Sequence, residues 1–179
     1  MDHYTDIELV ELSLDGVGDA FERLVKRHYE TVFRVSYKWC GLKEDAEDIT
    51  QEVFVKLAQK LNTFGRKSAF KTWLYRITVN TAKDFIRKCA AKRGYETAYA
   101  MEQDDSNPGL PPGHHLEAKR LYGALGRLSE KQKAAVLLVL SEGLSHQEAA
   151  RVLNCPAATV SWRIFQARKT LKKYLEHQI

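Results

Sequence analysis

The stretch that most constrains the fold is 143–171, GLSHQEAARVLNCPAATVSWRIFQARKTL, which predicts two helices joined by a tight turn. Ser145 and Glu148 have the capping-box spacing that starts a helix. Asn154 tolerates the left-handed backbone conformation in which helices often end. Pro156 suits the first turn of the next helix, where its missing N–H costs nothing. We therefore expect a helix-turn-helix, whose second helix is shaped to enter the major groove of duplex DNA.

The second helix of this pair has one apolar side and one polar, basic side. Val160, Ile164 and Ala167 recur at helical spacing and should face a core. From Pro156 to Lys173 there are five basic residues and no acidic one. Such a face either binds DNA or is a solvated surface whose cations complement the helix dipole. We favour DNA binding, because a helix that only packs on its own protein usually mixes the signs.

The charge distribution predicts two domains rather than one. Residues 1–93 carry a net charge of +3, residues 94–116 of −4, and residues 117–179 of +6. The middle segment holds three of the four prolines and shows no hydrophobic periodicity, so it reads as a flexible acidic linker. We expect two small domains, 1–93 and 117–179, joined by the linker 94–116, with two surfaces for polyanions.

Nearly all of the remaining sequence predicts helix, which gives an all-α fold class. Capping-box pairs start helices at Thr5 and at Ser129. Helical spacing of apolar residues predicts further helices over 19–40, from about residue 43, over 70–92, and over 116–128 and 129–141. His28 lies on an apolar stripe, so we expect a core histidine rather than a site. The helix 129–141 is apolar on most sides and should form the core of the second domain.

Acidic and polar side chains gather on one side of the helix that begins near residue 43. They are Asp45, Asp48, Gln51 and Glu52. Like charges three and four residues apart mildly destabilise a helix. An ordinary acidic first turn accounts for the early members through the helix dipole, but not for Gln51 and Glu52. We therefore expect a basic partner for this face.

The next segment combines aromatic and basic residues in a way that suits single-stranded nucleic acid. Residues 62–69, NTFGRKSA, predict a loop with two cations and an exposed Phe64. From Lys67 to Arg93 there are eight basic residues and one acidic residue. Trp73 at helical spacing is more often a core residue than a stacking platform. We therefore expect base contacts in the loop and at polar positions such as Asn80.

The sequence offers little for metals, cofactors or membranes. The three cysteines lie far apart and suit small buried residues in a reducing compartment. No cysteine or histidine pair has the usual spacing of zinc ligands, so neither a metal nor a cofactor is expected. The N-terminus is acidic and lacks an apolar segment, and no apolar run reaches membrane-spanning length. We expect a cytoplasmic protein without membrane insertion.

Three motifs in this order resemble the bacterial RNA polymerase sigma factors of the extracytoplasmic-function (ECF) subgroup, over about residues 19–173. They are DAEDITQEVF, FKTWLYRITVN with the basic run behind it, and LSHQEAARVLNCPAATVSWRIFQAR. The resemblance implies sigma region 2 in the first domain and sigma region 4 in the second. It implies an alternative sigma factor, not an enzyme, that binds core RNA polymerase and directs initiation by reading −10 and −35 elements. An anti-sigma factor is implied as a further partner.

The resemblance also implies roles for individual residues. Asp45, Asp48, Gln51 and Glu52 match positions that meet the clamp helices of the largest polymerase subunit. The loop 62–69 matches the loop that captures a flipped base of single-stranded −10 DNA. Residues expected at the −10 element are Phe64, Arg66, Lys67, Ser68, Lys71, Arg76, Asn80, Lys83, Arg87 and Lys88. Residues expected at duplex −35 DNA are Ala158, Thr159, Ser161, Trp162, Arg163, Gln166, Arg168 and Lys169. At position 162 many members of the resembled family carry a small or polar residue where this chain has tryptophan. The −35 sequence that this chain reads therefore does not follow from the family pattern.

Two other functions account for parts of the sequence less well. A helix-turn-helix repressor or activator that works without polymerase would account for residues 116–179 only. An enzyme would need a constellation of nucleophile, base and orienting group, which the scattered carboxylates do not supply. The linker's negative charge suits mimicry of nucleic acid in the basic channel of the polymerase, which we keep as a hypothesis.

Overall fold

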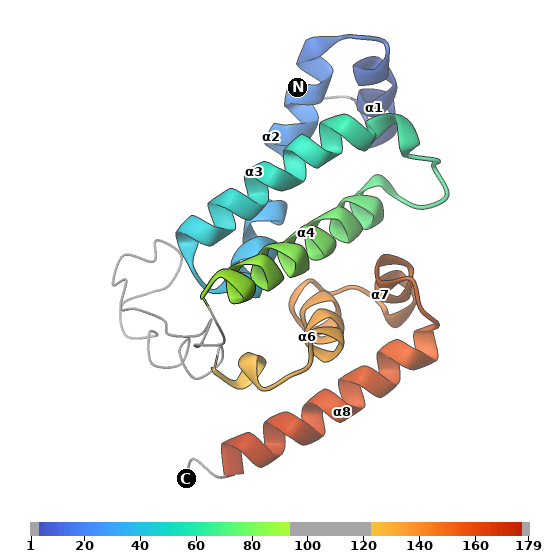
Figure 1. Ribbon diagram of the computed structural model, residues 1–179. Helices are drawn as coiled ribbons and strands as arrows, with labels where there is room; N and C mark the ends of the chain where they lie inside the picture. Colours follow the sequence, from blue (N-terminus) through green and yellow to red (C-terminus); the bar gives the residue numbers. More distant parts are fainter. Residues whose placement is uncertain (1–3, 94–122, 177–179) are drawn as a thin grey trace, which may run out of the picture. The chain divides into compact units, whose positions relative to one another are not determined.

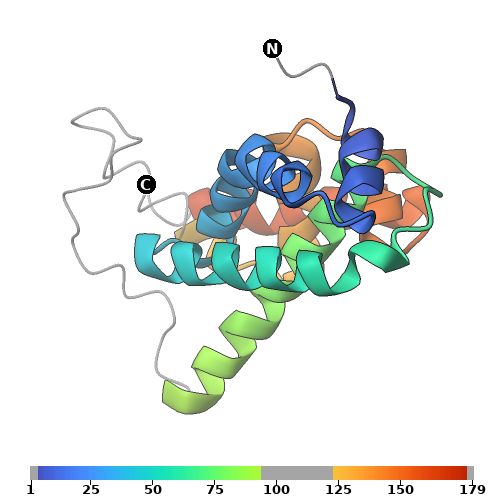
Figure 2. The same ribbon diagram turned by 90° about the horizontal axis from the view of Figure 1, so that it is seen from above.

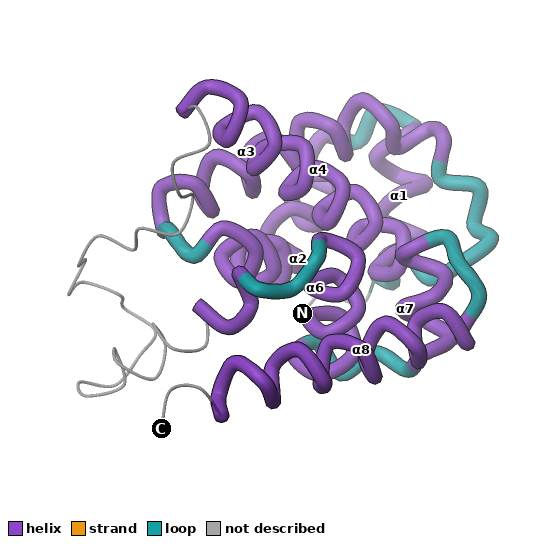
Figure 3. Tube along the Cα trace, turned by 60° about the horizontal axis from the view of Figure 1, so that its bottom comes forward, coloured by secondary structure: helices purple, strands orange, loops and turns teal. Residues whose placement is uncertain are grey.

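The structure is a computed structural model, and it describes residues 4–93 and 123–176. Within these ranges every regular element is a helix (Figure 3), so the all-α fold class is confirmed. The chain forms two compact units, whose described parts are residues 4–40 with 44–85, and residues 41–43 with 86–93 and 123–176. The expected linker 94–116 lies outside the described residues, and the exact domain limits stay a prediction.

The described part of the first unit is made of four α-helices, the last of which continues beyond residue 85, and one short 3₁₀-helix (Figure 1). These are α1 (Asp6–Leu14), α2 (Gly18–Cys40), α3 (Lys43–Lys60), η1 (Leu61–Thr63) and α4 (Phe70–Arg93). The predicted capping box of Thr5 and Glu8 is formed in full at the start of α1. Gly41, with a φ of +78°, follows the end of α2, where a left-handed residue stops a helix most easily.

Side chains from α2, α3 and α4 meet in one core. Leu24, Ile49 and Leu74, one from each helix, are between 0 and 2 % exposed. The ring of Tyr29 on α2 stacks on that of Phe54 on α3, with 6.2 Å between centroids. Lys56 Nζ on α3 donates to Thr81 Oγ1 on α4 at 3.2 Å. Figure 2 shows α3 running across α4 in the view from above.

The second unit contains α6 (Glu130–Val136), the π-helix η2 (Leu137–Ser141), α7 (His146–Leu153) and α8 (Ala157–Glu176). The capping box of Ser129 and Gln132 opens α6 as predicted. Of the expected helix 116–128, the described part is helical over 123–126.

The expected helix over 129–141 is present, and its last turn, η2, is a π-helix rather than an α-helix. The Glu142 N–H donates to the Leu137 carbonyl, five residues back, at 3.0 Å. The wider turn keeps Leu137 and Leu138 buried while Leu140 is 54 % exposed.

Candidate functional site

The turn between α7 and α8 has the geometry that its sequence predicts. Ser145 and Glu148 form both hydrogen bonds of the capping box. Asn154 adopts the left-handed conformation, with φ 48° and ψ 54°. The carbonyl of Pro156 accepts the first helical hydrogen bonds of α8. His146 Nδ1 on α7 lies 2.7 Å from Ser161 Oγ on α8, so the two helices also meet through polar side chains.

The side of α8 that faces away from this unit's core carries the predicted duplex-DNA residues. Val160, Ile164 and Ala167 are buried as expected. Ala158, Ser161, Trp162, Arg168 and Lys169 are exposed, whereas Thr159, Arg163 and Gln166 are half-buried. The half-buried guanidinium of Arg163 reaches back to Cys155 Sγ in the turn at 3.5 Å.

Phe165 belongs to the same face, and our sequence reasoning did not assign it a role. Its side chain is 64 % exposed and that of Trp162 is 60 % exposed. Residues three apart lie on one helix face, so the spacing from Trp162 was the signal that could have identified it. Two large exposed rings among cations distinguish this face from an ordinary solvated helix surface.

On α3, the predicted polymerase-binding residues differ in accessibility. Asp48 and Gln51 are exposed, while Asp45 and Glu52 are half-buried. The carboxylate of Glu52 lies 2.7 Å from Lys56 Nζ, so part of its charge is already compensated within the helix. Asp48 and Gln51 are therefore the members most open to a partner.

These two residues line an open groove of about 700 Å³ between α2 and α3. Its apolar lining consists of Phe21, Val25, Tyr29, Phe54, Val55 and Ala58, and Glu47 adds a second carboxylate. Sequence reasoning did not predict the groove. Helical spacing puts Phe21, Val25 and Tyr29 on one apolar side of the helix 19–40, but it does not tell how far each is exposed. Tyr29 is in fact 42 % exposed and Val55 52 % exposed.

The expectation of an exposed Phe64 is wrong. Its side chain is only 8 % exposed and packs edge-on against Phe70 at 5.6 Å and against Trp73 at 5.2 Å. The Phe64 N–H bonds back to the Leu61 carbonyl of the 3₁₀-helix η1 at 3.1 Å, and the ring lies between those of Phe70 and Trp73. A ring held in this way belongs to the core and is not available to stack on a base.

The other residues predicted for the −10 element follow the loop and α4. Lys67, Lys71, Arg76, Asn80, Arg87 and Lys88 are exposed, and Ser68 and Lys83 are half-buried. The ammonium of Lys83 lies 5.8 Å from the ring centre of Trp39, within the range of a cation–π interaction. Arg66 is exposed as well, but its guanidinium lies 2.6 Å from the Glu11 carboxylate on α1.

Comparison with known proteins identifies the family of this chain. The Sigma-70 region 2 model matches residues 24–93, and the Sigma-70 region 4 model matches residues 118–171. The chain is 32 % identical to the ECF RNA polymerase sigma-E factor of Haemophilus influenzae over 182 residues, which cover 96 % of each chain. This chain belongs to the ECF sigma factors. The sigma-E factor of Escherichia coli is also 32 % identical, over 93 % of this sigma factor and 92 % of its own length.

Solved structures agree with the fold. CnrH, in complex with the cytosolic domain of CnrY, matches with a TM-score of 0.72 and 27 % identity over 96 % of this sigma factor and 97 % of that chain. RpoE from Bartonella quintana, a sigma factor in complex with the anti-sigma factor NepR, matches with a TM-score of 0.67 and 23 % identity, over 87 % and 96 %. Within residues 4–93 and 123–176, no helix has the length and apolar character needed to cross a bilayer.

Proposed function

We propose that this ECF sigma factor binds core RNA polymerase through α2 and α3 and directs initiation at promoters that its two domains contact. The observation that carries the proposal is that the two units present two chemically different surfaces. One unit presents an apolar groove beside exposed acidic and amide side chains, and the other presents a basic helix-turn-helix face. A protein that bound duplex DNA alone would have no use for the first surface.

The polymerase contact is assigned to Asp45, Asp48, Gln51 and Glu52 together with the groove. The apolar floor suits the side chains of a partner helix, and the carboxylates suit lysine or arginine at its edge. The clamp helices of the largest polymerase subunit are the proposed partner, which supplies the cations that an acidic helix face favours.

The −35 contact is assigned to the exposed face of α8. Ala158, Thr159, Trp162 and Gln166 are proposed to meet base edges in the major groove. Arg163, Arg168 and Lys169, with Ser161, are proposed to position the helix on phosphates, a role that carries no sequence information by itself.

The −10 contact is assigned to the loop 62–69 and to the exposed face of α4. Flipping a base out of the stack costs a few kcal/mol, which a fitted pocket with hydrogen bonds to the base edge offsets. Asn80 and Ser68 offer such hydrogen bonds. Lys67, Lys71, Arg76, Lys83, Arg87 and Lys88 are proposed to hold phosphates. Phe64 is proposed to support the loop from inside rather than to touch DNA.

Regulation, compartment and the linker complete the proposal. An anti-sigma factor is proposed to hold the protein inactive by covering one of these surfaces, supported by the anti-sigma complex of the similar fold from Bartonella quintana. The protein is proposed to act in the cytoplasm, where core polymerase is found, and to catalyse no reaction of its own. The acidic linker 94–116 is proposed to mimic nucleic acid in the polymerase channel.

The test is transcription in vitro with purified core polymerase and a pool of randomised promoters, read by sequencing the transcripts. We expect start sites that share −10 and −35 sequences. The variant Asp48→Ala/Gln51→Ala should lose about tenfold or more of this activity at limiting protein, because both truncations fall at the centre of the proposed interface. Asp19→Ala/Gln59→Ala is the matched control, since both side chains are exposed in the same unit but do not line the groove.

The contrary outcome is equally clear. If wild-type protein gives no transcript but binds duplex DNA tightly by itself, the protein is a repressor or activator that works without core polymerase. If the double variant and its control transcribe equally, initiation stands but the polymerase contact lies elsewhere.

A further inference from the structure

We propose that α1 contributes to binding of the −10 element by the loop 62–69. In this proposal Glu11 on α1 positions Arg66 and thereby fixes the conformation of the loop that meets single-stranded DNA. This inference rests on the proposed function and assigns a role to a helix outside the Sigma-70 region 2 match, which begins at residue 24. Glu11 is a positioning residue here, since it acts on DNA only through Arg66.

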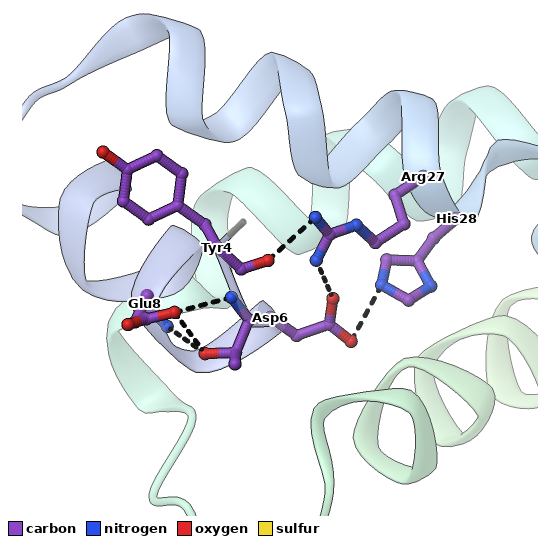
Figure 4. A network of polar contacts seen from close by, with 6 residues as sticks. Tyr4, Asp6, Glu8, Arg27 and His28 are labelled. Carbon is purple, nitrogen blue, oxygen red and sulfur yellow. Dashed lines mark hydrogen bonds and ion pairs between the residues drawn. The ribbon is translucent and has the colours of Figure 1, made fainter. Parts of the chain in front are cut away.

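The first step is that α1 is firmly attached to α2. Asp6 Oδ1 accepts a hydrogen bond from the Arg27 guanidinium at 2.9 Å, and Asp6 Oδ2 lies 3.1 Å from His28 Nε2 (Figure 4). Arg27 also donates to the Tyr4 carbonyl at 2.9 Å, just before the helix begins. Leu9 and Val10 are 1 and 2 % exposed, so the inner face of α1 is part of the core. A side chain on α1 therefore has a fixed base.

The second step is the unusual backbone of Arg66. Its φ is +52°, in the left-handed region that glycine, asparagine and aspartate tolerate far better than arginine. The side chain of this same residue is held by Glu11, whose Oε1 lies 2.6 Å from the guanidinium. A disfavoured conformation persists only where the surroundings fix it, and such residues gather at functional sites.

The third step is that both ends of the loop are anchored as well. Phe64 is buried among aromatic rings at the start, and the Ala69 carbonyl accepts the first hydrogen bonds of α4 at the end. Arg66 lies between these anchors, next to the exposed cation Lys67. The ion pair with Glu11 is thus a third point of attachment, at the part of the loop that neither anchor reaches.

Together these contacts give Glu11 a specific task. With the pair formed, the backbone of residues 65–67 keeps one curvature, and the groups that meet an extruded base keep one spacing. Without it, Arg66 relaxes toward ordinary backbone angles and the loop loses that shape. The guanidinium of Arg66 then serves mainly to attach the loop to α1. The neighbouring exposed cation, Lys67, is the one that contacts phosphate.

The experiment uses the full chain with core polymerase on a promoter from the transcription selection. 2-Aminopurine in the −10 element reports strand opening by stopped-flow fluorescence. Glu11→Gln keeps the shape of the side chain but removes its charge, and we expect opening to slow about two- to fivefold, the range for loss of an exposed ion pair. Glu22→Gln, which removes an ion pair with Lys26 elsewhere in the same unit, is the matched control and should open at the wild-type rate.

A second variant separates positioning from general damage. Asparagine tolerates the left-handed conformation without an ion pair to hold it, so Arg66→Asn should keep the conformation of the loop while removing the ion pair with Glu11. We expect Glu11→Gln to have no further effect in the Arg66→Asn background. An abasic site at each non-template −10 position in turn adds a second readout. The abasic position that slows strand opening most with wild-type protein should slow it less with Glu11→Gln.

Two results would overturn the inference. One is a Glu11→Gln holoenzyme that opens the promoter at the wild-type rate. The other is an equal loss in the wild-type and Arg66→Asn backgrounds, which would mean a role unrelated to the loop. Failure of wild-type protein to support any initiation would instead overturn the proposed function, so the two failures are distinguishable.

Discussion

At the scale of single residues, the exposed rings of Trp162 and Phe165 call for a reason. Both rings are more than half exposed on one face of a helix that also carries cations, and neighbouring exposed apolar side chains mark interaction sites. In the major groove, the C5-methyl group of thymine is the apolar feature that such a ring can contact. The pair is therefore suited to distinguish thymine from other bases in the −35 element.

Replacing the −35 thymines by uracil removes only those methyl groups and tests this role. Burial of one methyl group is worth about 0.8 kcal/mol, so each contacted thymine should weaken wild-type holoenzyme binding about fourfold when replaced. Trp162→Ala/Phe165→Ala should bind thymine and uracil promoters equally, as measured by equilibrium binding of fluorescent DNA. Leu140→Ala removes another exposed apolar side chain of the same unit and should keep the wild-type preference. A double variant that still prefers thymine would exclude the contact.

At the scale of elements, the start of α1 depends on a charged cap. The Thr5 N–H donates to the Glu8 carboxylate at 2.6 Å, and the Thr5 hydroxyl adds a second hydrogen bond. These bonds favour the ionised form and hold the pKa of Glu8 below its ordinary value of 4.5. A carboxyl with a depressed pKa stabilises the fold above its unfolded pKa, and this stabilisation is lost as the pH falls through the folded value.

We therefore expect α1 to lose the part of its stability that comes from this cap as the pH falls. Helical Cα chemical shifts of residues 6–14, followed by NMR from pH 7 downwards, should move toward coil values at and below about pH 4. Glu8→Gln cannot ionise, so its α1 should lose this part of the pH dependence. Any dependence that remains in the variant belongs to other groups. Identical titrations in both proteins would contradict the role of the cap.

The elements that sequence predicted correctly are those governed by local chemistry. The three capping boxes and the left-handed Asn154 depend on residues within one or two turns of each other, so their patterns are readable in the chain itself. The inward turn of Phe64 and the π-helix at Leu137–Ser141 depend on which space the core leaves to fill. The α2–α3 groove and the ion pair of Glu11 with Arg66 join distant segments, and no periodicity reports such contacts.

At the scale of the whole molecule, two of the three proposed contact surfaces, one on each unit, are the expected targets of an inhibitor. The first is the helix segment Asp45–Glu52 with its groove, and the second is the segment Val160–Lys169 of α8. Because initiation requires polymerase and promoter together, covering either surface is enough to silence the protein. An anti-sigma factor is therefore expected to protect at least one of them.

Hydrogen exchange of the complex with its anti-sigma factor, read by mass spectrometry, tests this expectation. Amides of one or both segments should exchange more slowly in the complex than in the free protein, while those of α6 should change little. The same measurement on the complex with core polymerase gives the comparison for the first segment. Unchanged exchange in both segments would mean that inhibition works through another part of the chain.

The burial of Phe64 has a consequence for the heat capacity of promoter binding. Segments that fold upon binding bury apolar surface at that moment and give a large negative heat-capacity change. Here the apolar surface of the loop is already removed from water when the domain folds. Binding of single-stranded −10 DNA by the holoenzyme should therefore show little heat-capacity change from this loop. The enthalpy assignable to the loop should vary little with temperature.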